Sequence, residues 1–112
     1  MPAMDITSAY AQRRPAQVDF DATVSSAPRF FFGSRTHAMH EAFDVGTKAG
    51  PVEIVDNVSI APRCPVTLGD RIHVCGEMVH DPGRLPVVHW THHDPSGRHA
   101  GGFIRLRGRV YA

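Results

Sequence analysis

The sequence has few of the residues that mark secreted or membrane-spanning proteins. Its 112 residues include two cysteines, Cys64 and Cys75, which lack both the density of a disulfide framework and the spacing of metal ligands. We therefore expect free thiols in a reducing compartment, which predicts a soluble, cytoplasmic protein. No stretch approaches the roughly 20 apolar residues of a membrane span. The N-terminal segment also lacks the uninterrupted apolar run of an export signal.

An excess of charge of one sign is also missing. Twelve Lys and Arg residues oppose eleven Asp and Glu residues, which gives a net charge of +1. Such a balance produces no field that would gather nucleic acid or an anionic membrane, so we expect neither as a partner. Arg105, Arg107 and Arg109 alternate along one predicted strand and could bind phosphate. A solvated face or a row of salt bridges between subunits is the commoner explanation of such a row.

What the sequence does contain is a series of short β-like segments in a chain long enough for one domain. Their alternating or β-branched residues predict strands, and Pro-, Gly- and Asp-rich breakers between them predict turns joining antiparallel neighbours. Residues 1–16 are weakly periodic and are expected to form an N-terminal arm or a short helix. The predicted strands cover residues 17–24, 52–60, 71–80, 85–93 and 102–112.

One segment departs from this β pattern and predicts a helix. In residues 34–49, Ser34 or Thr36 can cap the N-terminus, and Gly50-Pro51 can stop the helix. Apolar residues at helical spacing provide one side for packing: Ala38, Met39, Ala42 and Phe43. The predicted order is a strand, a helix and four strands, which corresponds to an α+β domain with its lone helix packed on a sheet.

Two longer stretches carry a family resemblance. "VSIAPRCPVTLGDRIHVCGEMVH" and "HWTHHDPSGRHAGGFIRLRGRV" resemble the hot-dog superfamily of acyl-CoA and acyl-carrier thioesterases and dehydratases, through Pro65, Gly69-Asp70 and the turn at residues 94–98. The resemblance covers residues 30–112. It implies that residues 17–112 form a hot-dog domain, in which a curved antiparallel sheet of about five strands wraps round a central helix. It also implies a homodimer or tetramer with acyl pockets at the interface.

The predicted helix carries a polar stripe. Because residues three, four and seven apart share a helix face, His37, His40, Glu41 and Asp44 would lie together. Pairing of His37 with Glu41 and of His40 with Asp44 would raise the histidine pKa values and favour acid–base chemistry near neutral pH. A solvent-facing stripe of weak ion pairs is the alternative that the residues alone leave open.

The family resemblance turns this stripe into a predicted active site. It implies hydrolysis of a thioester of coenzyme A or of an acyl carrier protein, with Glu41 activating water or attacking the carbonyl and Asp44 in reserve. In an acyl-thioester dehydratase or hydratase of the same fold, His37 or His40 would be the base. No cofactor is expected. The resemblance places substrate-binding residues at the helix entry, along the acyl tunnel and on an aromatic wall: Gly33, Ser34, Phe32 and Trp90.

Two other interpretations remain open at this stage. His73 and Cys75 share one strand face and His89 and His93 share another, so a metal site across the strands is conceivable. The spacing is common in ordinary strands and lacks the His-x-His of metal barrels, so no metal is expected. A non-catalytic small β-barrel that binds a ligand is the alternative from a different functional class.

Overall fold

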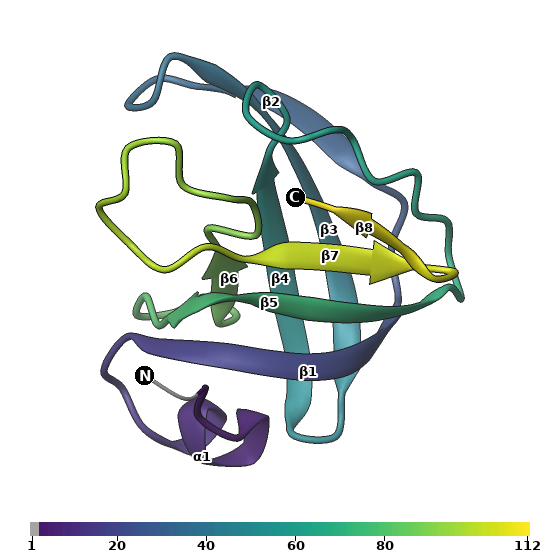
Figure 1. Ribbon diagram of the computed structural model, residues 1–112. Helices are drawn as coiled ribbons and strands as arrows, with labels where there is room; N and C mark the ends of the chain where they lie inside the picture. The colour runs from purple at the N-terminus through teal and green to yellow at the C-terminus, as the bar shows by residue number, and fades with distance from the viewer. Residues whose placement is uncertain (1–2) are drawn as a thin grey trace.

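The chain folds almost entirely into β-strands in the computed structural model, which describes residues 3–112 (Figure 1). Within this range no helix is long and apolar enough to cross a membrane. In chain order the elements are α1 (Ile6–Ala11), β1 (Ala16–Val24), β2 (Arg29–Gly33), β3 (Ala38–Thr47), β4 (Gly50–Asn57), β5 (Arg71–Val79), β6 (Val87–His89), β7 (Phe103–Leu106) and β8 (Arg109–Tyr111).

Five of these strands close into a barrel. β1 pairs with both β3 and β5, so the hydrogen-bonded ring runs β1-β3-β4-β6-β5 and returns to β1. Only the β4–β6 pairing within this ring is parallel. This closed five-stranded arrangement corresponds to the Greek-key barrel of the OB-fold. β2 extends the edge of β3, and the β7–β8 hairpin continues from β5 (Figure 1).

The core follows from strict alternation along the barrel strands. In β1, Val18, Phe20, Ala22 and Val24 are buried, whereas the residues between them are exposed or half-buried. The same period of two holds in β4 and β5, so each strand contributes one apolar face to the interior. Because the ring of strands is closed, these apolar faces pack together in one core.

The single helix lies outside the barrel, next to β1 (Figure 1). Asp5 caps it, because its carboxylate accepts hydrogen bonds from the backbone N–H groups of Thr7 and Ser8. Ile6 and Ala9 join the core cluster and anchor the helix. The N-terminal arm predicted over residues 1–16 therefore contains a packed helix at residues 6–11. Residues 1–2 of that arm lie outside the described part of the chain.

The prediction of a hot-dog fold is wrong. No central helix is present in residues 3–112, because the segment expected to form it is strand β3 and pairs with β1, β2 and β4. The inward positions of β3 are Glu41, Phe43 and Val45, all fully buried. A carboxylate in this inward row interrupts the apolar alternation, and the remaining apolar residues then fall at helix-like spacing.

The other strand predictions are confirmed to different extents. Residues 17–24, 52–60 and 71–80 coincide closely with β1, β4 and β5. Only three of residues 85–93 form a strand, β6. The last predicted strand is a hairpin that turns at Arg107 and Gly108, both with positive φ. The three alternating arginines near the C-terminus therefore do not form one row along a strand.

Substitution of Gly102 by Ala will test how tightly the chain is packed beside β5. A Cβ atom at this position would lie 2.3 Å from the carbonyl oxygens of both Cys75 and Trp90, which are fixed backbone atoms. We expect Gly102→Ala to lower the free energy of unfolding by about 1–3 kcal/mol in urea titrations.

Gly46 in β3 provides the matched control. A Cβ atom there would meet nothing within 4 Å, so Gly46→Ala should leave stability unchanged or raise it by about 0.4–1 kcal/mol. Equal stability of the Gly102→Ala variant and the wild type would show that the β5 region is not packed as described.

Candidate ligand-binding groove

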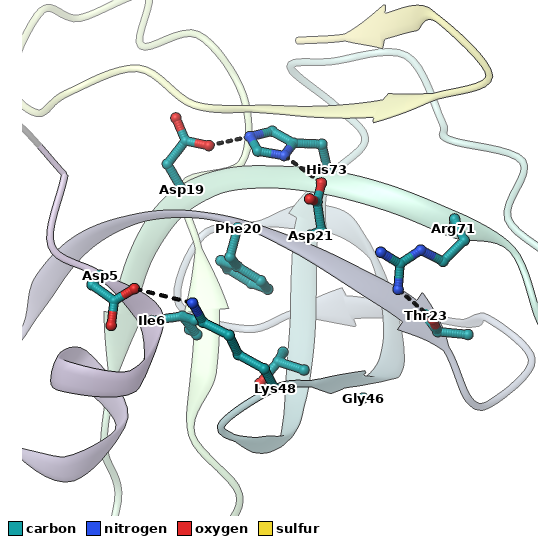
Figure 2. A pocket seen from close by; sticks show the side chains of 11 residues that line it. Asp5, Ile6, Asp19, Phe20, Asp21, Thr23, Gly46, Lys48, Arg71 and His73 are labelled. Atoms are coloured by element: carbon teal, nitrogen blue, oxygen red, sulfur yellow. Dashed lines mark hydrogen bonds and ion pairs between the residues drawn. The ribbon is translucent and has the colours of Figure 1, made fainter.

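A pocket with a volume of about 700 Å³ is lined by residues of β1 and β5 together with Asp5, Ile6 and residues 46–48 (Figure 2). His73 projects from β5 between two carboxylates of β1. Its Nδ1 lies 2.8 Å from Asp21 Oδ1, and its Nε2 contacts Asp19. The hydrogen bond to His73 holds the pKa of Asp21 below its usual value. Both ring nitrogens are therefore occupied by partners within the protein.

The remaining polar groups of this pocket are also paired. Lys48 lies 3.4 Å from Asp5, and the Arg71 guanidinium donates to the Thr23 hydroxyl at 3.1 Å (Figure 2). A ligand would have to displace these partners before binding. The pocket is therefore better understood as a surface charge network than as a binding site.

A second surface, on the outer side of β3 and β4, has a different character. Three adjoining hollows with volumes of about 500, 200 and 370 Å³ share their walls. Val55 and His89 line the first two, Thr36 and His40 line the second and third, and Phe31 lines the first and third. We call this continuous depression the groove. It lies where OB-folds bind oligonucleotides and oligosaccharides, on the second and third barrel strands and their flanking loops.

Strand register sets the order of side chains across the groove. Arg29 of β2 pairs with Ala42 of β3, which pairs with Val55 of β4. In the next outward row, Phe31 pairs with His40 and His40 with Asn57. Because paired residues in neighbouring strands point to the same side of a sheet, each row crosses the groove from edge to centre.

One end of the groove is polar and contains two arginines. Arg29 donates to Glu53 at 2.7 Å and to Asp44 at 3.3 Å, and Arg84 approaches Glu53 at 3.5 Å. Glu53 is the least exposed of these groups, with 17% of its side chain accessible. The two arginine side chains are about half exposed or more, and each guanidinium has more N–H donors than these contacts use.

Exposed phenylalanines of β2 lie at the groove: Phe31 and Phe32 line it, whereas Phe30 lines none of its three hollows. Phe30, Phe31 and Phe32 are 42%, 43% and 60% exposed. β2 lies outside the barrel ring and pairs only with β3, so neither of its faces is covered by the core. Phe31 is stacked on the His40 ring with the ring centroids 5.3 Å apart. The Arg63 guanidinium lies 4.5 Å from the centre of the Phe30 ring.

The hollow of about 200 Å³ is a histidine pocket at the other side of Val55. We use this name for the space lined by Thr36, His40, Val55, Asn57, Ile60, His89, Trp90, His92 and His99. The Trp90 ring is stacked between His89 and His99, with centroid distances of 4.6 and 3.8 Å. These three flat rings give the pocket a rigid aromatic wall.

Asp94 holds the loop that carries this wall. Its carboxylate accepts hydrogen bonds from the Ser96 hydroxyl and from the backbone N–H groups of Ser96, Arg98 and His99. These hydrogen bonds, of which the Ser96 hydroxyl contributes most, hold the pKa of Asp94 far below its usual value. An ionised Asp94 thereby keeps His99 in place against Trp90.

The predicted catalytic residues do not form one site. Glu41 is fully buried inside the barrel, whereas His40 and Asp44 lie on the outward side of β3. His37 lies in the β2–β3 turn with φ of 53° and contacts Phe32 edge to face at 6.4 Å. Within the described residues no hydrogen bond or ion pair joins His37 to Glu41 or His40 to Asp44.

The predicted substrate-binding residues lie much closer together. Phe32, Gly33 and Ser34 line the hollow at the β2–β3 turn together with His40, and Trp90 lines the neighbouring histidine pocket. The residues that the sequence interpretation missed are Arg29, Phe31, Arg84, His92 and His99. The clustered rings in "RFFFG" and "HWTHH" were the available signal for most of them. These two segments are far apart in the sequence and come together only in the folded chain, so no local pattern shows that they line adjoining hollows.

Glu41 has a different role inside the barrel, where it is paired in register with Asp56 of β4. Both side chains are fully buried, and each leaves one carboxylate oxygen without a hydrogen-bond partner. Glu41 accepts from the Cys64 backbone N–H at 3.2 Å, and Asp56 accepts from the Thr91 hydroxyl at 3.0 Å. Burial raises the pKa of Glu41, and it raises the pKa of Asp56 to about 7.

Metal ligation is not prepared in the described part of the chain. No group of three or more His, Cys, Asp or Glu side chains in residues 3–112 is arranged so that it could hold a metal ion. The set that was conceivable from the sequence, His73, Cys75, His89 and His93, is therefore not assembled. His73 and His89 instead contact carboxylates of Asp21 and Glu77, respectively, each at 2.8 Å.

Comparisons with known proteins support the fold and leave the activity open. The family model described as "Protein of unknown function (DUF3465)" matches residues 6–112. No curated protein sequence matches the chain significantly. A crystal structure of the tetrameric p202 HIN2 is similar with a TM-score of 0.50 and 15% sequence identity, over 79% of this chain and 45% of that chain. At that identity the similarity concerns the fold alone, and the chain spans less than half of that structure.

The buried acid pair predicts that stability falls as pH rises. Folded Asp56 keeps its proton until pH about 7, whereas an unfolded aspartate loses it near 3.8. Between these values the folded state binds more protons, so the free energy of unfolding decreases with rising pH. The stabilisation is complete below pH 3.8 and is lost as pH passes 7.

Asp56→Asn should remove the part of this dependence that Asp56 contributes, because an amide keeps the Thr91 hydrogen bond without a titrating proton. We expect the variant to exceed wild-type stability by roughly 2–4 kcal/mol at pH 8 and to match it near pH 4.5, as measured by urea unfolding. Asp81→Asn, at an exposed loop position, should change stability by less than about 0.5 kcal/mol at both pH values. A constant difference between wild type and Asp56→Asn across this range would contradict the pairing.

Proposed function

The chain belongs to the DUF3465 family, and we propose that it is a non-catalytic binding module that holds single-stranded nucleic acid in the groove. The observation that carries the proposal is a pair of exposed phenylalanines on β2, Phe31 and Phe32, that line one continuous depression together with arginine and histidine side chains. Flat rings and cationic groups in this arrangement suit a strand whose bases are unpaired.

Base stacking is the first contribution. Phe31 is about half exposed, and its position over His40 fixes one face of its ring while the rest stays accessible. Phe32 lines the next hollow along the groove. An aromatic ring accepts the face of any base, and such stacking is worth about 1–3 kcal/mol per base.

Contacts to the phosphate backbone are the second contribution. Arg29 and Arg84 lie at one end of the groove, and Arg35 lines the hollow at the other end. Glu53 and Asp44 compensate part of this charge, so attraction of phosphate is moderate. The net charge of +1 is an average over the whole chain, and the prediction that nucleic acid is not a partner depended on that average.

The interior of the barrel supports a binding role over a catalytic one. The acids Glu41 and Asp56 are fully buried and lie on the inward side of their strands, away from the groove. Burial raises the pKa of the Cys64 thiol to about 12, so this cysteine stays protonated and is a poor nucleophile. The thioesterase prediction depended on a central helix that the structure replaces with β3.

Two further parts of the proposal concern location and assembly. The proposed location is the cytoplasm, because Cys64 and Cys75 are both free thiols, as is typical of cytoplasmic proteins. A homodimer or tetramer stays a prediction from the sequence. The groove described above is built from one copy of the chain and does not require a second.

Phe31→Ala will test the proposed function most simply. Loss of a stacking platform should weaken binding of a fluorescent 15-nucleotide single strand by roughly 5- to 150-fold, which corresponds to about 1–3 kcal/mol. Fluorescence anisotropy at fixed salt gives the Kd. Because Phe31 is exposed and lies outside the barrel core, the variant should keep the wild-type circular dichroism spectrum.

Phe103→Ala is the matched control. Phe103 is a half-buried phenylalanine on β7, where it contacts His73 and lies outside the groove. The proposal requires that this variant binds the oligonucleotide like the wild type. Absence of binding by the wild type, or equal losses in the two variants, would refute it.

A further inference from the structure

The histidine pocket contains imidazole rings whose hydrogen positions are fixed by the backbone. His40 Nδ1 lies 3.1 Å from the Ala38 carbonyl oxygen, and His92 Nδ1 lies 2.6 Å from the His93 carbonyl oxygen. A carbonyl oxygen can only accept, so Nδ1 must carry the hydrogen and donate it. In the neutral ring Nε2 then holds a free lone pair, so both rings offer an acceptor.

These acceptors remain unoccupied within the described residues. No hydrogen bond from protein groups in residues 3–112 reaches Nε2 of His40 or of His92, and neither atom is enclosed, since the buried polar atoms without a partner are oxygens of Glu41 and Asp56. The histidines of the pocket are not arranged so that three of them could hold a metal ion, so a ligand with N–H donors is the simpler partner. Burial lowers the pKa of His92, which keeps its ring neutral and accepting at pH 7 and above.

The size and walls of the pocket suit one flat ring. Its volume of about 200 Å³ is below the roughly 300–1,000 Å³ of pockets that hold drug-sized molecules. The stacked rings of His89, Trp90 and His99 form one side of the pocket. Asn57 adds a side-chain amide whose Oδ1 already accepts from the Ser59 N–H, so its NH₂ group is the part left to donate.

We propose that the histidine pocket binds a single base that carries an exocyclic amino group, cytosine or adenine, and discriminates against thymine and uracil. The amino group donates to Nε2 of His40 or His92, and the adjacent acceptor nitrogen of the base receives a hydrogen bond from Asn57. Thymine and uracil place a carbonyl oxygen where the amino group would lie, so two acceptors would face each other. This inference rests on the proposed function, because the strand reaches the pocket along the groove through the shared walls of Val55 and His89.

The experiment compares 15-nucleotide strands of dC, dA and dT on the intact chain at pH 8. Wild-type protein should bind dC and dA about 10-fold or more tightly than dT, the size expected for one good base contact. A strand of 2′-deoxyzebularine, the analogue of 2′-deoxycytidine that lacks the 4-amino group, should bind like dT. This ligand-side comparison does not depend on any variant folding correctly.

Two variants test the pocket directly. His92→Leu and His40→Leu should each reduce the preference for dC over dT to less than about 3-fold. His93→Leu is the matched control, because His93 is an exposed neighbour that does not line the pocket, and it should keep the preference. Circular dichroism confirms folding, and His40→Leu provides a second test if His92→Leu is unstable.

The outcomes separate this inference from the proposed function. Equal affinity of the wild type for dC, dA and dT would overturn the base preference while the groove still binds single strands. A preference for dC that survives both histidine variants would also overturn it. Failure of all three strands to bind would overturn the proposed function and this inference together.

Discussion

The antiparallel register of β3 decides the side of the barrel on which each of its side chains lies. Alternation places Glu41, Phe43 and Val45 inside, and it places His40 and Ala42 in the groove. A slip of one residue would exchange the two sets, because side chains on a strand alternate with a period of two. Pairing with β4 on one edge and with β1 on the other fixes the register of β3. The position of β2 is set by its pairing with β3.

The same register creates opposite environments on the two sides of one strand pair. Outside, polar and aromatic groups meet solvent in the groove and retain free donors and acceptors. Inside, Glu41 and Asp56 are paired in register and fully buried, so burial favours their protonated forms. The apolar pairs of Phe43 with Ile54 and of Val45 with Val52 provide the burial that offsets this acid pair.

Local sequence patterns were sufficient for part of the fold. The apolar alternation of β1, β4 and β5 and the turns after them are local signals, so these strands were predictable. β3 was not predictable in this way, because the polar residue Glu41 occupies an inward position and interrupts the apolar alternation with a period of two. Closure of the barrel depends on the pairing of β1 with β5, more than 50 residues apart at Asp21 and His73, and no local pattern encodes it.

The candidate site could be predicted only in fragments for the same reason. Trp90, His40, Phe32, Gly33 and Ser34 were selected from the sequence, and the structure places them in adjoining hollows. The chemistry assigned to them was drawn from a family whose local turns resemble this chain while its central helix is absent here. No local sequence pattern identifies Arg29 or Arg84 as a site residue. Their common position becomes apparent only in the structure, where β2 and the β5–β6 loop line the same hollow.

Titration of isotopically labelled protein with a 15-nucleotide single strand, followed by backbone amide chemical shifts, tests the groove most directly. Shifts should concentrate in β2, in the outward residues of β3 and β4, and in residues 80–92. Amides of β1 and β7 around Asp19, Asp21 and Phe103 should stay unchanged. Shifts centred on that charged pocket, or none at millimolar strand, would contradict binding in the groove.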